Sequence, residues 1–253
     1  MKTLEITSKD NSTFKSLKLL LTSRGIKDEK CFFFVGEKLI QDFIKKPNPH
    51  FKIKNVVTFE NGPDLVISDL QIKLKKELFN ELDILGTHYP LLILEYKPVE
   101  EFNFQIEPAG LEIISPLGDP KNLGALVRSA VAFGASKIIL TQESCHPYLP
   151  HVIKSSAGSI LNISIFVSPL KINQIAITGS NFGLDLNGTA LTKIEWPKNL
   201  RLLIGEEGPG LNLSHEQTKK IKMIHIPMAS SIESLNATVS ASITMWHWLT
   251  SKV

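Results

Sequence analysis

The chain has 253 residues, of which 43% are hydrophobic, and its formal net charge is +3 at pH 7. This length allows one large domain or two modest ones, with enough apolar residues for a sizeable core. The longest aliphatic run, Leu91–Leu94, is far too short to cross a bilayer, and no apolar signal-peptide core follows Met1–Glu5. Two cysteines, Cys31 and Cys145, are too few for a disulfide framework and lack the neighbours of a zinc site. We therefore expect a cytoplasmic protein without a metal.

Positive charge is concentrated at the start of the chain. Residues 1–54 hold 12 Lys or Arg against 6 Asp or Glu, whereas residues 55–108 hold 4 against 10 and residues 109–253 hold 12 against 9. A basic surface attracts phosphate groups, but a solvated face explains the same charges equally well. The sequence leaves both interpretations open.

The first block, residues 1–105, has the pattern of a small α/β unit. Apolar spacing and breaker residues predict helices over 14–21, 39–44 and 68–85, and strands over 31–35, 55–59 and 91–95. Ser12 or Thr13 is the expected cap of the first helix. Residues 97–108, which include two prolines, are expected to form a linker.

The second block, residues 106–253, alternates strands with helices. We expect strands over 111–115, 137–140, 163–167, 182–186, 201–204 and 224–226, and helices over 122–133, 152–161, 215–221 and 235–249. Such alternation is typical of a parallel sheet with helices on its faces.

The first of three chemically suggestive segments is Asp119-Pro-Lys-Asn-Leu-Gly-Ala-Leu-Val-Arg128, where a strand ends and a helix begins. Such a junction offers unpaired backbone N–H groups. Asn122 is expected at the cap and Arg128 nearly two turns into the helix, where its guanidinium could bind a phosphate or carboxylate. An ordinary helix start with a surface arginine is the simpler alternative.

The second segment is Leu203-Ile-Gly-Glu-Glu-Gly-Pro-Gly-Leu211. Its glycines and proline predict a tight loop whose backbone a ligand can approach closely, and Glu206 and Glu207 add two carboxylates. A plain Gly-Pro turn is the alternative. No lysine follows the last glycine, so the loop does not match the phosphate-binding P-loop.

The third segment is Ile226-Pro-Met-Ala-Ser-Ser-Ile-Glu-Ser-Leu-Asn236. A strand ends at its proline, a polar loop follows, and a helix is expected to start near Ser234, whose side chain could be no more than a cap. The helix that follows is rich in small residues, which suits close approach by a partner.

In this order the three segments resemble the three motifs of the SpoU (TrmH-like) family of RNA ribose 2′-O-methyltransferases, within the SPOUT group. The resemblance covers about residues 110–250 and includes Lys154-Ser-Ser-Ala-Gly158. The third motif departs from the family pattern at Ser230, Ala237 and Ser240, but not at Glu233, Ser234 or Asn236. The first block resembles, less specifically, the small RNA-binding domain often fused to such enzymes.

The resemblance implies a parallel sheet whose C-terminal segment forms a trefoil knot, S-adenosylmethionine as cofactor, an rRNA or tRNA substrate, and a homodimer. It implies cofactor contacts at Gly205, Gly210, Ile226, Met228 and Leu235. It implies catalytic roles for Asn122, Arg128, Glu207, Ser234 and Asn236.

Two points stay open at this level. The family assigns Arg128 a critical role, sometimes as a base, but a guanidinium with a pKa above about 12 is a poor base and a good phosphate ligand.

Two competing functions are weighed against this one. The intact motif residues argue against a non-catalytic RNA-binding module. The missing G-x-G-x-x-G argues against a nucleotide-dependent oxidoreductase.

Overall fold

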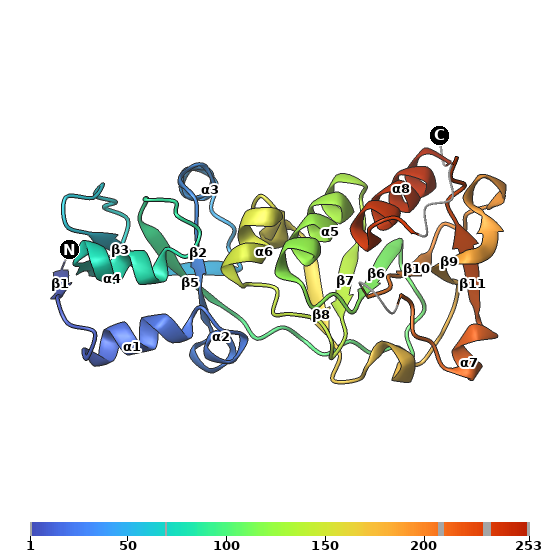
Figure 1. Cartoon of the computed structure of the whole chain (residues 1–253), viewed down its shortest axis with the longest axis horizontal. Helices are drawn as coiled ribbons and strands as arrows, with labels where there is room; N and C mark the ends of the chain where they lie inside the picture. The colour runs from blue at the N-terminus through green and yellow to red at the C-terminus, as the bar shows by residue number, and fades with distance from the viewer. Residues whose placement is uncertain (1, 69, 207–209, 230–233, 252–253) are drawn as a thin grey trace. The chain divides into compact units, whose positions relative to one another are not determined.

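The computed structural model describes residues 2–68, 70–206, 210–229 and 234–251 (Figure 1). By their internal contacts, these residues form two compact units, Met1–Pro98 with His146–Leu161, and Val99–Cys145 with Asn162–Val253. The predicted division into residues 1–105 and 106–253 differs from these units mainly in segment 146–161, which packs with the N-terminal unit. None of the helices in the described part of the chain combines the length and apolar character needed to cross a membrane.

The N-terminal unit is built on a mixed five-stranded sheet of order β1-β4-β3-β5-β2. β1, β4 and β3 are parallel to one another, whereas β5 runs antiparallel to β3 and β2. The strands are β1 (Lys2–Ile6), β2 (Cys31–Phe34), β3 (Phe51–Phe59), β4 (Leu70–Leu74) and β5 (Leu91–Tyr96). The helices are α1 (Ser12–Leu19), α2 (Ser23–Glu29), α3 (Glu37–Lys45) and α4 (Lys76–Leu82), together with α6 (Pro150–Ser155) from the later segment.

Two predictions for this unit are wrong. Residues 68–85 are not one helix, because Leu70–Leu74 forms a strand hydrogen-bonded to both β1 and β3, and only Lys76–Leu82 is helical. Tertiary pairing inside a sheet overrides the local preference here. The cap of α1 is Asn11, whose Oδ1 accepts the N–H groups of Thr13 and Phe14 at 2.9 and 3.3 Å. The other predicted elements are found with changed ends.

The segment His146–Leu161 completes the core of the N-terminal unit. Tyr148 stacks on Phe32 of β2 with ring centroids 4.5 Å apart, and α6 contacts the same strand. His146 is 7% exposed, and its Nδ1 accepts the N–H of Tyr148 at 3.2 Å. Its Nε2 therefore carries the proton and donates to the hydroxyl of Tyr96, 3.3 Å away. A segment from the second half of the chain thus supplies buried aromatic and polar groups to the N-terminal unit.

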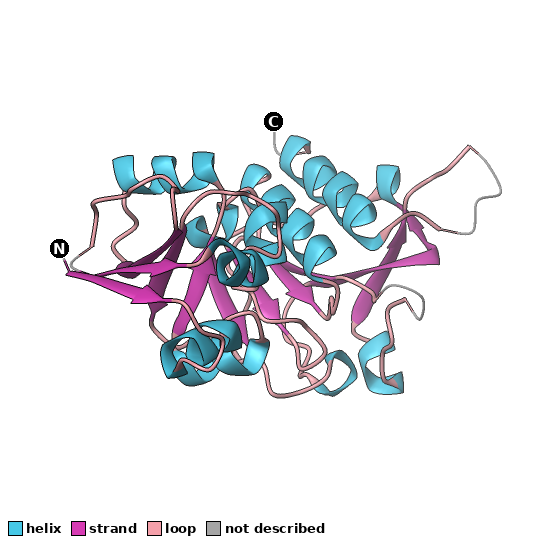
Figure 2. Ribbon diagram, turned by 60° about the vertical axis from the view of Figure 1, so that its left-hand side comes forward, coloured by secondary structure: helices cyan, strands magenta, loops and turns pink. Residues whose placement is uncertain are grey.

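The C-terminal unit is built on a six-stranded parallel sheet of order β11-β9-β10-β6-β7-β8, as the alternating pattern predicted. Figure 2 shows helices on both faces of the strands. The strands are β6 (Leu111–Ser115), β7 (Lys137–Leu140), β8 (Ser164–Val167), β9 (Asn181–Ala190), β10 (Leu200–Leu203) and β11 (Ile221–His225). The helices are α5 (Pro120–Ala132), α7 (His215–Thr218) and α8 (Ala237–Thr250), with short 3-10 turns η1 (Ser159–Asn162), η2 (Ile172–Gln174) and η3 (Leu191–Lys193).

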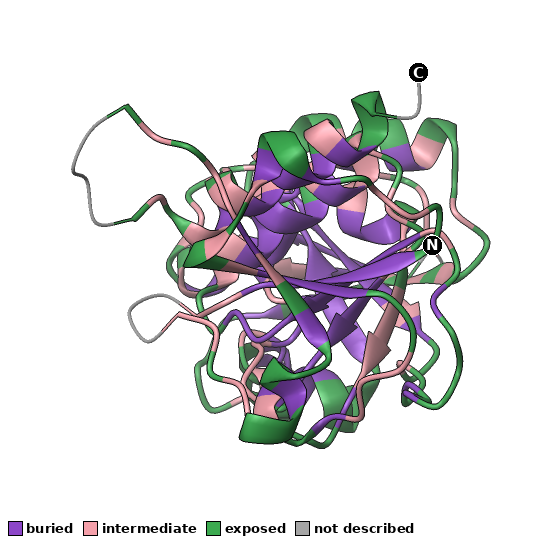
Figure 3. Ribbon diagram, turned by 90° about the vertical axis from the view of Figure 1, so that its right-hand side faces the viewer, coloured by how far each residue is buried: buried purple, intermediate pink, exposed green. Residues whose placement is uncertain are grey.

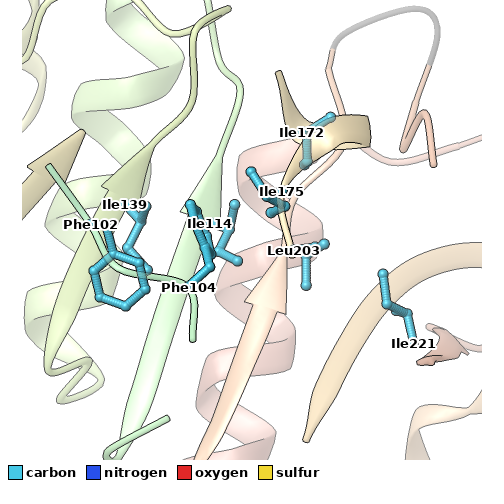
Figure 4. Close-up of a cluster of buried hydrophobic side chains, with 8 residues drawn as sticks. All are labelled: Phe102, Phe104, Ile114, Ile139, Ile172, Ile175, Leu203 and Ile221. Carbon is cyan, nitrogen blue, oxygen red and sulfur yellow. The ribbon is translucent and has the colours of Figure 1, made fainter. Parts of the chain in front are cut away.

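Burial explains why these strands form. β6 and β10 are buried along their whole length, as expected of central parallel strands covered on both faces (Figure 3). On one face, side chains from four strands and from η2 meet in a single cluster (Figure 4). Its buried members are Phe102, Phe104, Ile114, Ile139, Ile172, Ile175, Leu203 and Ile221.

The predicted linker is partly wrong, because its second half belongs to this core. Phe102 and Phe104 are buried, and the N–H of Phe102 donates to the carbonyl of Val167 at 2.8 Å. The fully buried guanidinium of Arg201 pairs with Glu112 at 2.8 Å and also donates to the carbonyl of Ile106. Apolar burial and a paired charge therefore fix this segment to the sheet.

Candidate functional site

A cleft of about 500 Å³ opens in the C-terminal unit where β10 and β11 end and α8 begins. Ligands of open α/β sheets usually bind beyond the carboxyl ends of the strands. The described residues that line it are Leu184, Asp185, Leu186, Ile204, Gly205, Glu206, Gly210, Leu211, Ile224, His225, Ile226, Met228, Ser234, Leu235, Asn236, Ala237 and Ser240.

All five residues predicted to contact the cofactor lie on this cleft. Gly205 and Gly210 come from the loop after β10, Ile226 and Met228 follow β11, and Leu235 precedes α8. Segments that are up to 30 residues apart in the sequence therefore meet at one place. Two of the predicted catalytic residues, Ser234 and Asn236, line the cleft as well.

The loop after β10 is closed by its own backbone. The N–H of Glu206 donates to the carbonyl of Gly210 at 2.9 Å, and the N–H of Gly210 donates back at 3.1 Å. A Cβ on Gly205 would lie 2.6 Å from the carbonyl carbon of Gly210, so no larger residue fits without moving the backbone. Gly210 has φ of +71°, which also favours glycine. The sequence predicted a tight loop here, and the backbone geometry at Gly205 and Gly210 confirms it.

Helix α8 is anchored at the cleft by Asn236. Its Oδ1 accepts the N–H groups of Thr238 and Val239 at 2.9 and 3.2 Å, which makes Asn236 the N-cap. The alternative interpretation of Ser234 as no more than a cap is therefore wrong, because the helix begins two residues later than expected. Ser234 lies on the cleft with no capping role.

The first motif lies on the helix that packs beside α8 (Figure 1). The predicted cap at Asn122 is wrong, because Asp119 caps α5 by accepting the N–H groups of Lys121 and Asn122, each at 2.9 Å. The carbonyl of Asn122 accepts the hydroxyl of Thr238 at 3.2 Å, which ties the start of α5 to the start of α8. Asn122 is therefore close to the cleft without lining it.

Arg128 does not line the cleft either. It lies on the exposed side of α5 and, among the residues that the structure describes, forms no hydrogen bond or ion pair. Glu207, the remaining predicted catalytic residue, lies outside the described residues, as do Ser230 and Glu233 of the third motif.

Sequence reasoning missed one wall of the cleft. Leu184, Asp185 and Leu186 come from β9, and His225 comes from the end of β11. The predicted strand over 182–186 was assigned no functional role. The available signal was the pair of glycines, Gly183 and Gly188, that flanks this stretch.

Comparison with known proteins identifies this arrangement. Residues 113–246 match the SpoU rRNA Methylase family. The chain belongs to this family. The match includes all three motif segments and every described residue of the cleft, so the SpoU cleft is the candidate active site.

Individual SpoU relatives extend the likeness over the whole chain. The chain is 30% identical over 256 residues to "Ribosomal RNA small subunit methyltransferase G 2" of Syntrophobacter fumaroxidans, which covers 96% of this chain and 49% of that protein. It therefore spans about half the length of this relative. It is 23% identical to the Bacillus subtilis "23S rRNA (guanosine(2553)-2'-O)-methyltransferase RlmP", covering 96% of this chain and 98% of that one.

The crystal structure of an AdoMet-bound rRNA methyltransferase from Sinorhizobium meliloti has the same fold. It aligns with a TM-score of 0.79 at 22% identity and covers 99% of each chain.

Proposed function

We propose that this SpoU-family chain is an S-adenosylmethionine-dependent methyltransferase that modifies a ribose 2′-hydroxyl in rRNA or tRNA. The observation that carries the proposal is the meeting of the second and third motif segments at one cleft. The relative from Bacillus subtilis is named as a 2′-O-methyltransferase of 23S rRNA, and the aligned structure from Sinorhizobium meliloti holds AdoMet. We also propose a cytoplasmic location, because a substrate of this kind is found there.

The residues of the cleft fit the cofactor. Its volume of about 500 Å³ is within the usual range for small-molecule sites. Gly205 and Gly210 leave room for a ligand to reach the backbone, and apolar side chains such as Ile226 and Leu235 provide surface for a nucleoside. Asp185 and Glu206 place carboxylates on a cleft that would receive a cationic ligand.

When bound, S-adenosylmethionine supplies an activated methyl group on a sulfonium. The chain's task is to place a ribose 2′-oxygen in line with that group and to exclude water. We assign binding of the cofactor to Gly205, Gly210, Ile226, Met228 and Leu235. We assign orientation of the ribose to Ser234 and Asn236, which lie at the cleft.

We assign to Arg128 the role of an RNA phosphate ligand. It is exposed, has no partner among the described residues, and presents the planar fork of N–H donors that matches a phosphate. The same properties argue against its acting as the base that removes the 2′-hydroxyl proton. Asn122 and Glu207 remain proposed as groups that orient this arginine and the substrate.

We further propose that the N-terminal unit docks RNA through the cations of α3, and not through those of α1 and α2. Lys15 and Lys18 on α1 and Arg24 on α2 each have a carboxylate neighbour, in the pairs Lys15–Asp10, Lys18–Glu81 and Arg24–Asp28. Lys38, Lys45 and Lys46 on and just after α3 are exposed and form no ion pair in the described part of the chain. A lysine that is not already paired with a carboxylate can neutralise an RNA phosphate without breaking an ion pair, and each neutralised phosphate releases counterions from the RNA.

Reversing the charge of each of the two sets of cations tests this assignment. Changing Lys38, Lys45 and Lys46 to Glu should weaken RNA binding and flatten its salt dependence by roughly 0.7–0.9 log units for each RNA phosphate that is no longer neutralised. The matched reversal of Lys15, Lys18 and Arg24 should have the smaller effect. Equal affinity and slope for both variants and the unchanged protein would move docking to the catalytic unit.

We also propose a homodimer formed through α8. Val239, Trp246 and Leu249 are 47%, 52% and 39% exposed, and their spacing places them on one side of the helix. Trp248 on the same helix is buried and donates its indole N–H to the carbonyl of Pro197 at 3.3 Å, so it is not part of this exposed surface. Exposed apolar stripes of this kind are typical of interfaces.

The proposed fold includes the trefoil knot implied by the family. What supports it is the path of the chain, because β11 pairs with β9 at the edge of the sheet while α8 returns to pack on α5. The described residues of this connection and of the loop after β10 line the same cleft. A crystal structure traced continuously from β9 to α8 tests this.

The proposed activity is tested by incubating the full chain with S-adenosylmethionine and protein-free rRNA or tRNA. Mass spectrometry of the nucleosides should find a 2′-O-methylated ribose. Methylation on a base only would contradict the proposed reaction.

A further inference from the structure

Strand β9 does not run evenly beside its neighbour β11. Gly183 lies opposite Met223, and Thr189 lies opposite Ile224, although Met223 and Ile224 are adjacent in sequence. Residues 184–188 are therefore extra residues on β9 that leave the ladder and return to it. We call residues 184–188 the β9 excursion. Such irregularities in a sheet often re-aim side chains next to an active site.

The β9 excursion forms the wall of the cleft that the sequence analysis missed. Its first three residues line the cleft, and residues 185–187 are exposed, with Leu186 58% exposed. Inside the excursion, the N–H of Asn187 donates to Oδ1 of Asp185 at 2.8 Å, which shapes a local turn. Because an exposed segment makes few packing contacts of its own, its position depends on how its two ends are held.

The far end of the excursion is held by His225. The ring Nδ1 of His225 lies 2.8 Å from the carbonyl oxygen of Gly188. A carbonyl oxygen only accepts hydrogen bonds, so Nδ1 must carry the hydrogen and donate it. A Cβ on Gly188 would lie 2.4 Å from the backbone nitrogen of Ile224, so only glycine allows the two strands to rejoin so closely.

We propose that His225 is a positioning residue for the cofactor, which acts by holding the β9 excursion in place as a wall of the cleft. This rests on the proposed function, because the cleft is taken to hold S-adenosylmethionine. His225 also lines the cleft, but its hydrogen bond to Gly188 is sufficient for this role. Loss of that bond loosens the wall, weakens cofactor binding and leaves the chemical step intact once the cofactor is saturating.

The test compares His225→Asn with His225→Leu in the full chain. The Asn and Leu side chains have similar shapes, but only the Asn amide can place an N–H close to the position that Nδ1 of His225 occupies. His225→Asn should keep the cofactor Kd and KM within about twofold of the unchanged protein. His225→Leu should raise both roughly three- to tenfold, the range expected when one hydrogen bond is removed. The kcat at saturating cofactor should be unchanged in both variants.

A second readout does not need the cofactor. Hydrogen exchange of the backbone amides of residues 184–188 in the ligand-free protein should be faster in His225→Leu than in His225→Asn or the unchanged protein. Failure of the unchanged protein to bind S-adenosylmethionine would overturn the proposed function, and the exchange rates would still decide whether His225 holds the excursion. Unchanged exchange and unchanged KM in His225→Leu would overturn the proposal. A fall in kcat with constant KM would overturn it as well, because His225 would then act in the reaction itself.

Discussion

The buried imidazole of His146 should make the stability of this protein fall in mild acid. Its pKa is lowered from 6.5 to about 4, first by burial and second by the nearby positive charge of Lys27. Burial also raises the pKa of the neighbouring Tyr96 to about 12, so the hydroxyl that faces the imidazole stays neutral. Protonation of the imidazole would place a positive charge in the core. It would also put a hydrogen on Nδ1, which could then no longer accept the N–H of Tyr148.

The sign and size of the effect follow from the two pKa values. Above pH 6.5 the imidazole is neutral in both folded and unfolded chains, so it adds no pH dependence. Between pH 6.5 and about 4 His146 binds a proton in the unfolded chain but not in the folded chain. The free energy of unfolding therefore decreases as the pH is lowered through this range. At about 1.4 kcal/mol per pH unit, the loss attributable to His146 is about 3 kcal/mol.

The assay is denaturant unfolding at several pH values for the unchanged protein and for His146→Asn. The Asn side chain cannot titrate, and its carbonyl can still accept the N–H of Tyr148. Both proteins share every other titrating group, so the difference between their free energies of unfolding isolates the imidazole. That difference should shift by about 3 kcal/mol between pH 7 and pH 4, in favour of the variant at low pH. A constant difference over this range would refute the assignment of a buried neutral histidine.

The remaining predictions concern the cleft and the surfaces around it. Arg128→Ala should abolish methyl transfer and leave calorimetric binding of S-adenosylmethionine nearly unchanged, whereas a parallel loss of both would show that this arginine helps to build the cofactor site. Asn236→Ala should lower the free energy of unfolding by about 1 kcal/mol through loss of the α8 cap, and Asn236→Asp, which keeps a capping oxygen, should restore most of it. Trp246→Lys should convert a dimer to a monomer in light scattering, while a monomeric unchanged protein would rule out the proposed interface. A chelator should leave cofactor binding unchanged in calorimetry, and loss of binding on chelation would point to a metal.

Local sequence signals were sufficient for much of the C-terminal unit. The bounds of β6 and β7 are as predicted, because short apolar runs between turn residues are buried on both faces of a parallel sheet. The three motif segments were also placed correctly at strand ends. The cleft residues Gly205 and Gly210 could be found because tight backbone geometry requires glycine there.

Features that depend on distant partners could not be predicted. Leu70–Leu74 became a strand through its pairing with β1 and β3, although its own residues suited a helix. Nothing in the sequence around His146 indicates that it contacts Tyr96 of β5, or that Tyr148 stacks on Phe32 of β2, far earlier in the chain. His225 and Asp185 escaped notice because their importance depends on the register of β9 and β11, which a periodic pattern does not reveal.

We propose that the cleft beside β10, β11 and α8 binds the methyl donor for 2′-O-methylation of RNA. The most direct test is incubation of the full chain with protein-free RNA and S-adenosylmethionine carrying a deuterated methyl group, followed by nucleoside mass spectrometry. The matched control is Gly205→Val, which fills the position where even a Cβ would lie 2.6 Å from the backbone of Gly210. We expect a labelled 2′-O-methylnucleoside with the unchanged protein and none with the control. Equal labelling by both proteins, with the control shown to be folded, would contradict it.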